Sequence, residues 1–309
     1  MTGRRPEGPP LTESPWSLVQ YQNSDSPPRA GIRAHGAVHA LPNGWPRTTM
    51  EILANWKHYG DRLASQSVAM LDQVPGARLV APITYPRKLL CAGANYYSHA
   101  AELGTAEPDP AGVPFFFLKT PTTAIVGPDA LIPIPKGDAP NFDWEAELGV
   151  VIGKGGKNIP RGEARSHVAG YVVANDLSAR GLFTRSDSVS PVFAYDWVAH
   201  KSQDGSCPIG PGIVPAWLVP DIEDRRLRLT VNDEVKQDST IGDLVVGIDG
   251  LVAAASEIVT LEPGDLILTG TPAGVGLAQG IFLAEGDVVV AEIDGVGEIR
   301  HTMIGGPQR

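Results

Sequence analysis

The chain has 309 residues, of which 42% are hydrophobic and 19% charged, and this is the composition of a folded globular protein. The formal net charge of -10 argues against nucleic acid or an anionic membrane as a partner, because both are bound by clustered Lys and Arg. No apolar run is long enough to span a membrane, and no secretory signal is recognisable. We therefore expect a cytoplasmic protein, and the separate cysteines Cys91 and Cys207 fit a reducing compartment.

The first part of the chain combines strand and helix patterns. Residues 1–14 are rich in Pro, Gly and polar side chains and predict a loose tail. Two strands are predicted at 16–22 and 29–42, on either side of a polar turn. Apolar residues then recur at threes and fours from 48 to 73, which predicts a helix that Gly60 could divide.

A change of composition at 74–88, which holds three prolines and one glycine, is typical of a linker. We therefore predict a small N-terminal α+β domain over 1–80, with a loose tail, and a second domain over 81–309. Short strand-like runs fill the second part, with one clear helix at 241–258. Many short strands and few helices predict an α+β, β-rich chain with a barrel or sandwich-like domain, rather than a doubly wound sheet.

Glycine-rich segments of the chain lack the spacing of phosphate-binding loops. GKGGKN does not match GxxxxGK[ST] and GTPAGVG does not match GxGxxG, which argues against nucleotide binding. No GxSxG nucleophile elbow occurs either, which argues against an α/β serine hydrolase.

Three carboxylates stand at the ends of predicted strands. Glu145 and Glu147 lie two apart at the start of the strand in DWEAELGVVIG, so their side chains point to one face. Asp176 ends the apolar strand in GYVVAND. Oxygen ligands alone favour a hard cation, namely magnesium, manganese or calcium, with water or substrate in the remaining positions. By spacing alone, a solvated strand edge is the commoner explanation of such a Glu pair.

A second constellation lies in NYYSHAAELG, where His99 and Glu102 are three residues apart and share a helical face. A carboxylate beside an imidazole orients the ring and raises its basicity, which suits a general base for water. Most pairs with this spacing are surface ion pairs, however. Taken alone, Lys201 could be an ordinary exposed lysine without a role in a site. Thr271 could likewise be an ordinary turn residue.

Taken together, these segments occur in an order that resembles the fumarylacetoacetate hydrolase family, from about Leu89 to Met303. The matching segments include the lid, a lysine-proline strand, the two metal motifs, a lysine loop and a C-terminal signature. In this chain they read NYYSHAAELG, FFFLKTPTTAIVGP, DWEAELGVVIG with ANDLSAR, KSQDGSCPIGP and GDLILTGTPAGVG. The resemblance implies a rolled, mixed β fold of barrel-like form and a homodimer.

The same resemblance assigns roles to the site residues. It implies that magnesium or manganese is bound by Glu145, Glu147 and Asp176. It implies that His99 and Glu102 form a water-activating dyad on a mobile lid.

Three further residues receive roles from the resemblance. Lys201 would stabilise developing oxyanion charge. Thr271 would hold a substrate carboxylate, and Lys119 matches a family position near the substrate.

The chain departs from the family pattern beside these motifs. Gly181 and Phe183 stand where Asp and Gln are frequent, and Ala199 and His200 stand where some members carry Arg before the lysine. The metal motifs are untouched by these changes. A Phe183 that faces the pocket would favour a substrate with an apolar tail.

The expected function is metal-dependent hydrolysis of a C–C bond in a small β-diketo acid, similar to an acylpyruvate or fumarylpyruvate of aromatic catabolism. His99, oriented by Glu102, would take a proton from water, and the hydroxide would attack a carbonyl before the C–C bond breaks. The need to stabilise an enolate favours a metal over a serine nucleophile. The alternatives are β-keto acid decarboxylation, keto–enol isomerisation at the same site, or a non-catalytic metal-binding scaffold.

Overall fold

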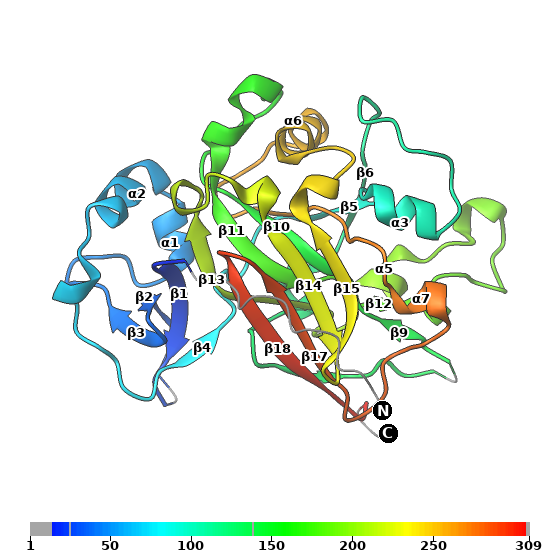
Figure 1. Cartoon of the computed structure of the whole chain (residues 1–309), viewed down its shortest axis with the longest axis horizontal. Coiled ribbons are helices and arrows are strands. Elements are labelled where there is room, and N and C mark those ends of the chain that lie inside the picture. The colour runs from blue at the N-terminus through cyan, green and yellow to red at the C-terminus, as the bar shows by residue number, and fades with distance from the viewer. Residues whose placement is uncertain (1–13, 25, 138, 307–309) are drawn as a thin grey trace, which may run out of the picture.

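The computed structural model describes residues 14–24, 26–137 and 139–306, and within them the chain is strand-rich and of the α+β class, as predicted (Figure 1). The larger sheet follows the order β3-β2-β1-β13-β11-β10-β16-β5-β6, with β4 beside β1 and β7 beside β13. Its strands are β1 (Ser17–Gln22), β2 (Arg29–Ala34), β3 (Ala37–Ala40), β4 (Arg78–Val80), β5 (Leu89–Gly93), β6 (Phe115–Leu118), β7 (Ile125–Val126), β10 (Ala146–Ile152), β11 (Val168–Asn175), β13 (Cys207–Pro215) and β16 (Leu266–Leu268).

A smaller sheet of the order β15-β14-β17-β18-β8 crosses the middle of the molecule (Figure 1). Its strands are β8 (Leu131–Pro133), β14 (Arg226–Val231), β15 (Glu234–Thr240), β17 (Val288–Ile293) and β18 (Gly297–Ile304), and a separate pair is formed by β9 (Phe142–Asp143) and β12 (Ser178–Ala179). Among the described residues, the strand orders are open paths rather than one closed barrel.

Helices are short and connect or cover the strands (Figure 1). The α-helices are α1 (Thr49–Leu53), α2 (Trp56–Ala64), α3 (Tyr97–Glu102), α4 (Pro121–Ala124), α5 (Trp197–Lys201), α6 (Ile248–Ile258) and α7 (Gly276–Gln279). Short 3-10 helices lie at Val68–Met70, Arg161–His167, Arg180–Leu182, Pro191–Phe193, Ala216–Leu218, Ile222–Asp224 and Ile241–Asp243. No helix in the described ranges is long and apolar enough to cross a bilayer.

The central strands β10 and β11 are buried on both faces. Leu148 and Val150 of β10 pack in one core together with residues of the smaller sheet, such as Leu229. Val151 and Val172 point the other way, into a second core with the N-terminal helices. Because side chains alternate along a strand, this second face is also the face of Glu145 and Glu147.

The N-terminal region is joined to the rest by strand pairing. Leu18 of β1 pairs with Ile213 of β13, so the strands of residues 17–40 continue the larger sheet. The predicted linker at 74–88 also contains a strand, β4, which pairs with β1, because its prolines flank rather than interrupt Arg78–Val80. The division of the chain near residue 80 stays a prediction.

Three predicted elements have different bounds in the structure. The strand predicted at 29–42 is a hairpin of β2 and β3, because His35 and Gly36 turn the chain with φ of 49° and 77°. The helix predicted at 48–73 divides at Ala54 and Asn55 rather than at Gly60, and it ends at Ala64. Gly60 lies inside α2, where a side chain would meet the Trp56 ring.

The helix predicted at 241–258 begins only at Ile248. Before it, the chain forms the short 3-10 helix Ile241–Asp243. It then leaves helical geometry, because the N–H groups of Val245 and Val246 donate to the backbone and side-chain carbonyl groups of Asn95, each at 2.9 Å. A tertiary contact therefore competes with the helical pattern and shortens the helix.

Candidate functional site

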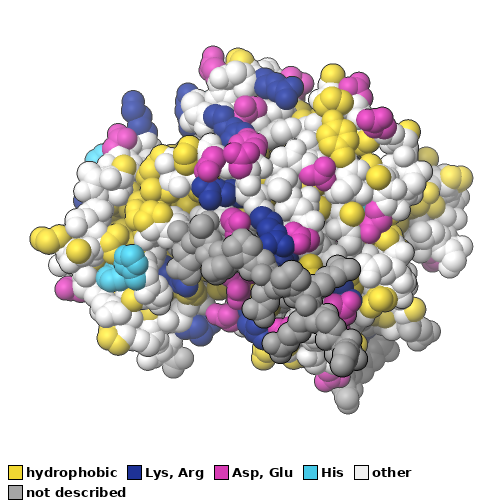
Figure 2. All heavy atoms as spheres, in the orientation of Figure 1, with side chains coloured by type: hydrophobic (Ala, Val, Ile, Leu, Met, Phe, Trp, Pro, Cys, Tyr) yellow, Lys and Arg dark blue, Asp and Glu magenta, His cyan; other side chains and the backbone are white. Residues whose placement is uncertain are grey.

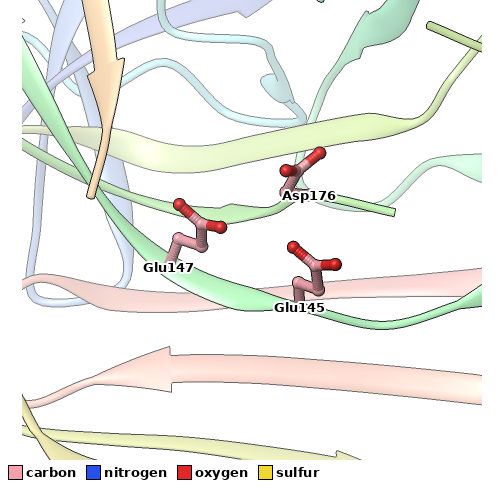
Figure 3. A group of neighbouring side chains, drawn as sticks. All are labelled: Glu145, Glu147 and Asp176. Carbon is pink, nitrogen blue, oxygen red and sulfur yellow. The ribbon is translucent and has the colours of Figure 1, made fainter. Parts of the chain in front are cut away.

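Glu145, Glu147 and Asp176 converge in the structure (Figure 3). Strands β10 and β11 run antiparallel, and the Asp176 N–H donates to the Glu145 carbonyl at 2.8 Å, so these two residues lie opposite each other. Glu147 follows on the same face of β10. All three side chains are buried, and ligand oxygens from each lie within 4.8 Å of one another. The convergence that the motifs predicted is thus produced by the register of one strand pair.

Two buried lysines reach this cluster. The Lys201 ammonium donates to Glu145 Oε2 and Asp176 Oδ2, at 2.8 Å each, and so bridges carboxylates from both strands. The Lys119 ammonium donates to Asp176 Oδ1 at 2.5 Å and to the Leu177 carbonyl at 2.9 Å. Both lysines therefore position carboxylates, and the substrate contacts expected for them stay predictions.

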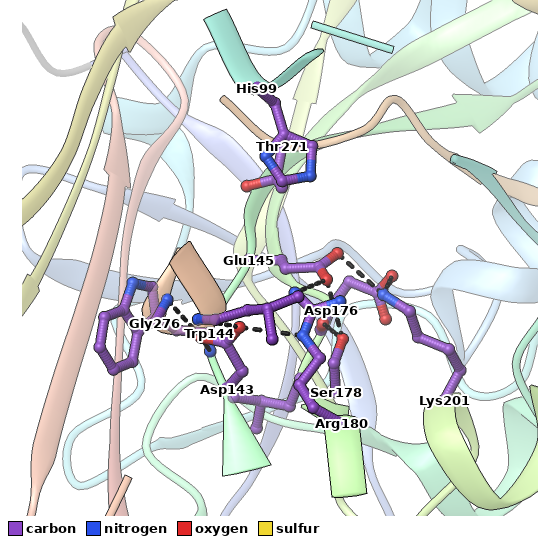
Figure 4. Close-up of polar contacts among 12 residues, drawn as sticks. His99, Asp143, Trp144, Glu145, Asp176, Ser178, Arg180, Lys201, Thr271 and Gly276 are labelled. Carbon is purple, nitrogen blue, oxygen red and sulfur yellow. Dashed lines mark hydrogen bonds and ion pairs between the residues drawn. The ribbon is translucent and has the colours of Figure 1, made fainter. Parts of the chain in front are cut away.

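Arg180, Ser178 and Asp143 also belong to the site, although sequence reasoning assigned no role to them. The Arg180 guanidinium donates to Glu145 at 2.6 Å and to Asp143 at 2.9 Å, and the Ser178 hydroxyl donates to Glu145 at 2.9 Å (Figure 4). Asp143 also accepts the N–H of Gly276 at 2.7 Å. The sequence could have indicated Ser178 and Arg180 by their position, because they complete the ANDLSAR motif two and four residues after Asp176.

The electrostatics of the carboxylates differ from one another. Burial raises the pKa of Glu145, but the Lys201 and Arg180 cations outweigh it and hold that pKa well below the usual range. The pKa of Glu147 is raised well above its usual range by burial and by the charges of Asp176 and Glu145. Burial lowers the pKa of Lys201, but Asp176 and Glu145 outweigh it and raise that pKa. Glu147 is thus the group that lacks a full counter-charge.

These residues fit a divalent cation of the hard type. Three buried carboxylates on one face supply oxygen ligands at mutual distances that a single ion can span. The Gly270 N–H holds Glu147 Oε2 at 2.7 Å, and Ser178 and Arg180 hold Glu145, so these two carboxylates are fixed by outer contacts of the kind that orient metal ligands. A cation would also compensate the charge of Glu147.

His99 and Glu102 are also brought together, and their role as a dyad stays a prediction. His99 Nδ1 lies 3.2 Å from Glu102 Oε2 on α3, and Glu102 Oε1 accepts the Gly274 N–H at 2.8 Å. Helix α3 is further attached through Ser98, which donates to Asp243 and accepts the Ala273 N–H at 3.3 Å. The loop of residues 270–276 therefore contacts the dyad at Gly274 and the carboxylate cluster at Gly270.

Thr271 lies in this loop between Gly270, which contacts Glu147, and Gly274, which contacts Glu102. Its hydroxyl donates to the Ala146 carbonyl at 2.9 Å and accepts from the Gln237 amide at 2.8 Å. In this structure the Thr271 hydroxyl fixes the loop against β10. The contact with a substrate carboxylate stays a prediction.

Phe183 belongs to an aromatic cluster beside the lysine helix α5. Its ring packs against Tyr195, Trp197 and His200, with ring centroids 5.0, 4.9 and 4.6 Å away. The next residue along the helix is Lys201, whose ammonium lies 4.9 Å from the centre of the Phe117 ring. The aromatic cluster thus borders the site, and a contact of Phe183 with substrate stays a prediction.

The chain is similar to known proteins over nearly its full length. It is 36% identical over 297 residues to oxaloacetate tautomerase fahd2, mitochondrial, of Xenopus laevis, which covers 93% of this chain and 90% of that protein. The structure of maleylpyruvate hydrolase from Sphingobium sp. SYK-6, in complex with manganese(II) and pyruvate, matches with a TM-score of 0.74 and 28% identity, over 94% of this chain and 100% of that one.

An isomerase structure is similar too. The 5-carboxymethyl-2-hydroxymuconate delta-isomerase from Mycobacterium smegmatis matches with a TM-score of 0.71 and 32% identity, over 94% of this chain and 100% of that one. The family model for the C-terminal domain of fumarylacetoacetate hydrolase matches residues 88–304, a range that contains the carboxylate cluster, the dyad and the lysines. The chain therefore belongs to the fumarylacetoacetate hydrolase family, whose members are enzymes.

Proposed function

We propose that the protein is a metal-dependent tautomerase that interconverts the keto and enol forms of a small 2-oxo diacid such as oxaloacetate. The observation that carries this proposal is the His99–Glu102 dyad, which is docked on the same loop that holds Glu147. A base beside a carboxylate-lined cation site is the arrangement needed to move a proton next to a carbonyl group. The name of the Xenopus laevis relative supports this alternative over the C–C hydrolysis expected first.

The charge of the site favours an anionic substrate. The cluster combines four carboxylates with three cations, which are Asp143, Glu145, Glu147, Asp176, Lys119, Arg180 and Lys201. With all of them ionised the cluster carries one net negative charge, and a divalent cation would turn this into one positive charge. The loaded site would therefore attract a carboxylate-bearing oxo-acid.

The chemistry needs only proton transfers. His99 would take the proton from the carbon beside the oxo group, and the proton would then be delivered to the oxo oxygen. One C–H bond breaks and one O–H bond forms, and the reverse direction restores the keto form. Glu102 would keep the imidazole oriented, because its second oxygen is fixed by the Gly274 N–H.

A divalent ion held by Glu145, Glu147 and Asp176 would supply Lewis acidity that makes the C–H group of a bound oxo-acid more acidic. We propose manganese or magnesium as the resident ion, and the manganese in the maleylpyruvate hydrolase structure supports this choice. Calcium is the third candidate, because it also prefers oxygen ligands.

The test uses oxaloacetate supplied as its enol. The ultraviolet band of the enol should decay faster with protein and Mn²⁺ than with Mn²⁺ alone, while pyruvate does not accumulate above the protein-free control. In D₂O, proton NMR should show exchange at the methylene carbon at a rate that depends on the protein. Equal rates with and without protein across a panel of 2-oxo diacids would contradict the proposal.

C–C hydrolysis is the second candidate, favoured by the likeness to maleylpyruvate hydrolase and by a dyad that could activate water. Acylpyruvates incubated with the protein and Mn²⁺ distinguish the two reactions. Two acid products mean hydrolysis, carbon dioxide means decarboxylation, and an isomer of unchanged mass means tautomerisation. No reaction across the panel would favour the non-catalytic scaffold.

The remaining expectations concern partners and compartment. Acidic and basic side chains are interspersed on the face shown in Figure 2, which supports a small-molecule substrate rather than nucleic acid or a membrane. The homodimer stays a prediction, which light scattering would check. Cytoplasmic residence also stays a prediction, and the vertebrate relative is named as mitochondrial.

A further inference from the structure

A buried polar contact connects the smaller sheet to the proposed metal site. His301 lies on β18, and its Nε2 is 3.0 Å from the side-chain nitrogen of Asn175, the last residue of β11. The Asn175 side-chain oxygen in turn accepts the Glu145 N–H at 2.8 Å. Only these two hydrogen bonds separate His301 from the backbone of a carboxylate ligand.

The donor and acceptor roles along this path are fixed by chemistry. The Glu145 N–H can only donate, so the Asn175 atom that faces it must be the oxygen. The Asn175 NH₂ group therefore faces His301, and a hydrogen bond forms only if Nε2 of the ring is an unprotonated acceptor. The ring proton then lies on Nδ1, and the imidazole is neutral.

His301 is a polar residue in an apolar row. The inward side chains of β18 are Ile299, His301 and Met303, and all three are buried. His301 Nδ1 has no hydrogen-bond partner among the described residues. An apolar side chain would avoid the unfavourable burial of that N–H group, so packing alone does not account for a histidine here.

Asn175 lies at the end of β11, opposite the start of β10, where the proposed ligands stand. Its side chain holds the Glu145 N–H, while the next residue, Asp176, holds the Glu145 carbonyl through its own N–H. These two hydrogen bonds set the separation of the Glu145 and Asp176 ligands. If the Asn175 amide rotated by half a turn, its NH₂ group would face the Glu145 N–H, and two donors would be opposed.

We propose that His301 is a positioning residue for the metal site, which acts through Asn175 to hold the Glu145 backbone opposite Asp176. The inference rests on the proposed metal site but not on the tautomerase reaction. Outer contacts of this kind commonly change metal affinity by about 10- to 100-fold when they are removed.

The test measures Mn²⁺ affinity by isothermal titration calorimetry without substrate. We expect His301→Leu to weaken binding by about 10-fold or more, and His301→Gln, whose carbonyl can accept from Asn175, to stay within about 3-fold of the parent. Met303→Leu, at the next inward position of β18, is the matched control and should bind Mn²⁺ like the parent. Equal losses in the Leu and Gln variants, or none in either, would overturn the proposal.

A double-mutant cycle separates positioning from packing. If His301 acts through Asn175, the variant that combines His301→Leu with Asn175→Ala should bind Mn²⁺ as Asn175→Ala does alone, whereas additive losses would contradict the path. Parent protein that bound no Mn²⁺ would instead refute the proposed metal site itself.

A measurement on the parent protein keeps the idea testable if a variant fails to fold. Long-range ¹H–¹⁵N NMR distinguishes the two neutral tautomers of histidine. We expect the proton of His301 on Nδ1 near neutral pH, with the ring signals assigned in the parent protein by through-bond correlation to the His301 backbone. A proton on Nε2 would contradict the proposed acceptor role.

Discussion

The proposed metal site and the proposed acid–base dyad are built by different means. Glu145, Glu147 and Asp176 stand at the ends of two paired, fully buried strands, so their convergence follows from a strand register. His99 and Glu102 stand on a six-residue helix that is attached through single contacts to a loop. The first group should therefore be rigid and the second adjustable, because loops and short helices are held by fewer interactions. This division allows the two groups to be perturbed separately.

The largest effect is expected at the cluster. Glu147→Gln keeps the shape of the side chain but removes a charged ligand, so Mn²⁺ affinity should fall by about 100-fold. Activity should fall by about 10³-fold or more, because Lewis-acid stabilisation is worth several kcal/mol. Calorimetry and the enol assay measure the two quantities. Glu298→Gln, at an exposed position of β18, is the control, and normal Mn²⁺ binding by Glu147→Gln would remove Glu147 from the ligands.

Removal of the proposed base, His99, should affect catalysis and leave metal binding unchanged. His99→Ala should lower kcat by about 10²- to 10⁴-fold, the usual contribution of a general base, and should leave Mn²⁺ affinity unchanged. The exposed histidine of α2 provides the control His58→Ala, which should keep full activity. If His99→Ala retained its turnover on the true substrate, another group would be the base.

A smaller effect is expected from the loop that carries the dyad. Gly274 has φ of 103°, and a Cβ there would overlap the Lys236 carbonyl, so Gly274→Ala should displace the N–H that holds Glu102. We expect about a 10- to 100-fold loss of kcat, because misplacement of about 1 Å can cost that much, with Mn²⁺ affinity retained. Gly162→Ala, at a position with open space around it, is the control. Parallel losses of turnover and Mn²⁺ affinity would show that the loop and the cluster are one rigid unit.

The smallest effect concerns stability and pH. Burial lowers the pKa of His200 to about 3, and the Lys201 and Arg180 charges lower it further, whereas the pKa of a histidine in the unfolded chain is about 6.5. Between these values the unfolded chain binds more protons than the folded chain, so this contribution to stability is present above pH 6.5 and is lost as the pH falls towards 3. From about pH 7 to about pH 5 the loss should be about 1–2 kcal/mol.

Urea unfolding of the metal-free protein at the two pH values measures this loss. His200→Gln removes the titrating group, so the variant should lose less stability between the two pH values than the parent does. The comparison cancels the contributions of other groups, such as Glu147. Identical pH dependence in parent and variant would show that His200 is not held neutral by the fold.

Most residues of the candidate site could be predicted from the sequence, because local backbone geometry brings them together. Glu145 and Glu147 share a face through the two-residue period of a strand, and His99 and Glu102 meet through the spacing of a helical turn. The approach of Asp176 to Glu145 depends on which strands pair, and it was predicted only from the order of the family motifs.

The contacts missed by sequence reasoning come from distant parts of the chain. His301 reaches Asn175 across 126 residues, and Asn95 holds Val246 across 151 residues, which shortens the helix expected from 241. No local pattern contains such contacts. The continuation of the larger sheet into the N-terminal strands through β1 and β13 was missed for the same reason, although the strand-rich α+β class was predicted.

The loop of residues 270–276 has a consequence for how binding events influence each other. The Gly270 N–H donates to Glu147 and the Gly274 N–H donates to Glu102. A single short segment is therefore in contact with both a proposed cation ligand and the helix that carries the proposed base. If loading with a cation favours the attached form of α3 by some coupling free energy, attachment of α3 must strengthen cation binding by the same amount. A substrate that holds the helix against the loop would thus raise the affinity of the protein for the ion by that amount, and the change of Mn²⁺ affinity in Gly274→Ala measures the size of the coupling.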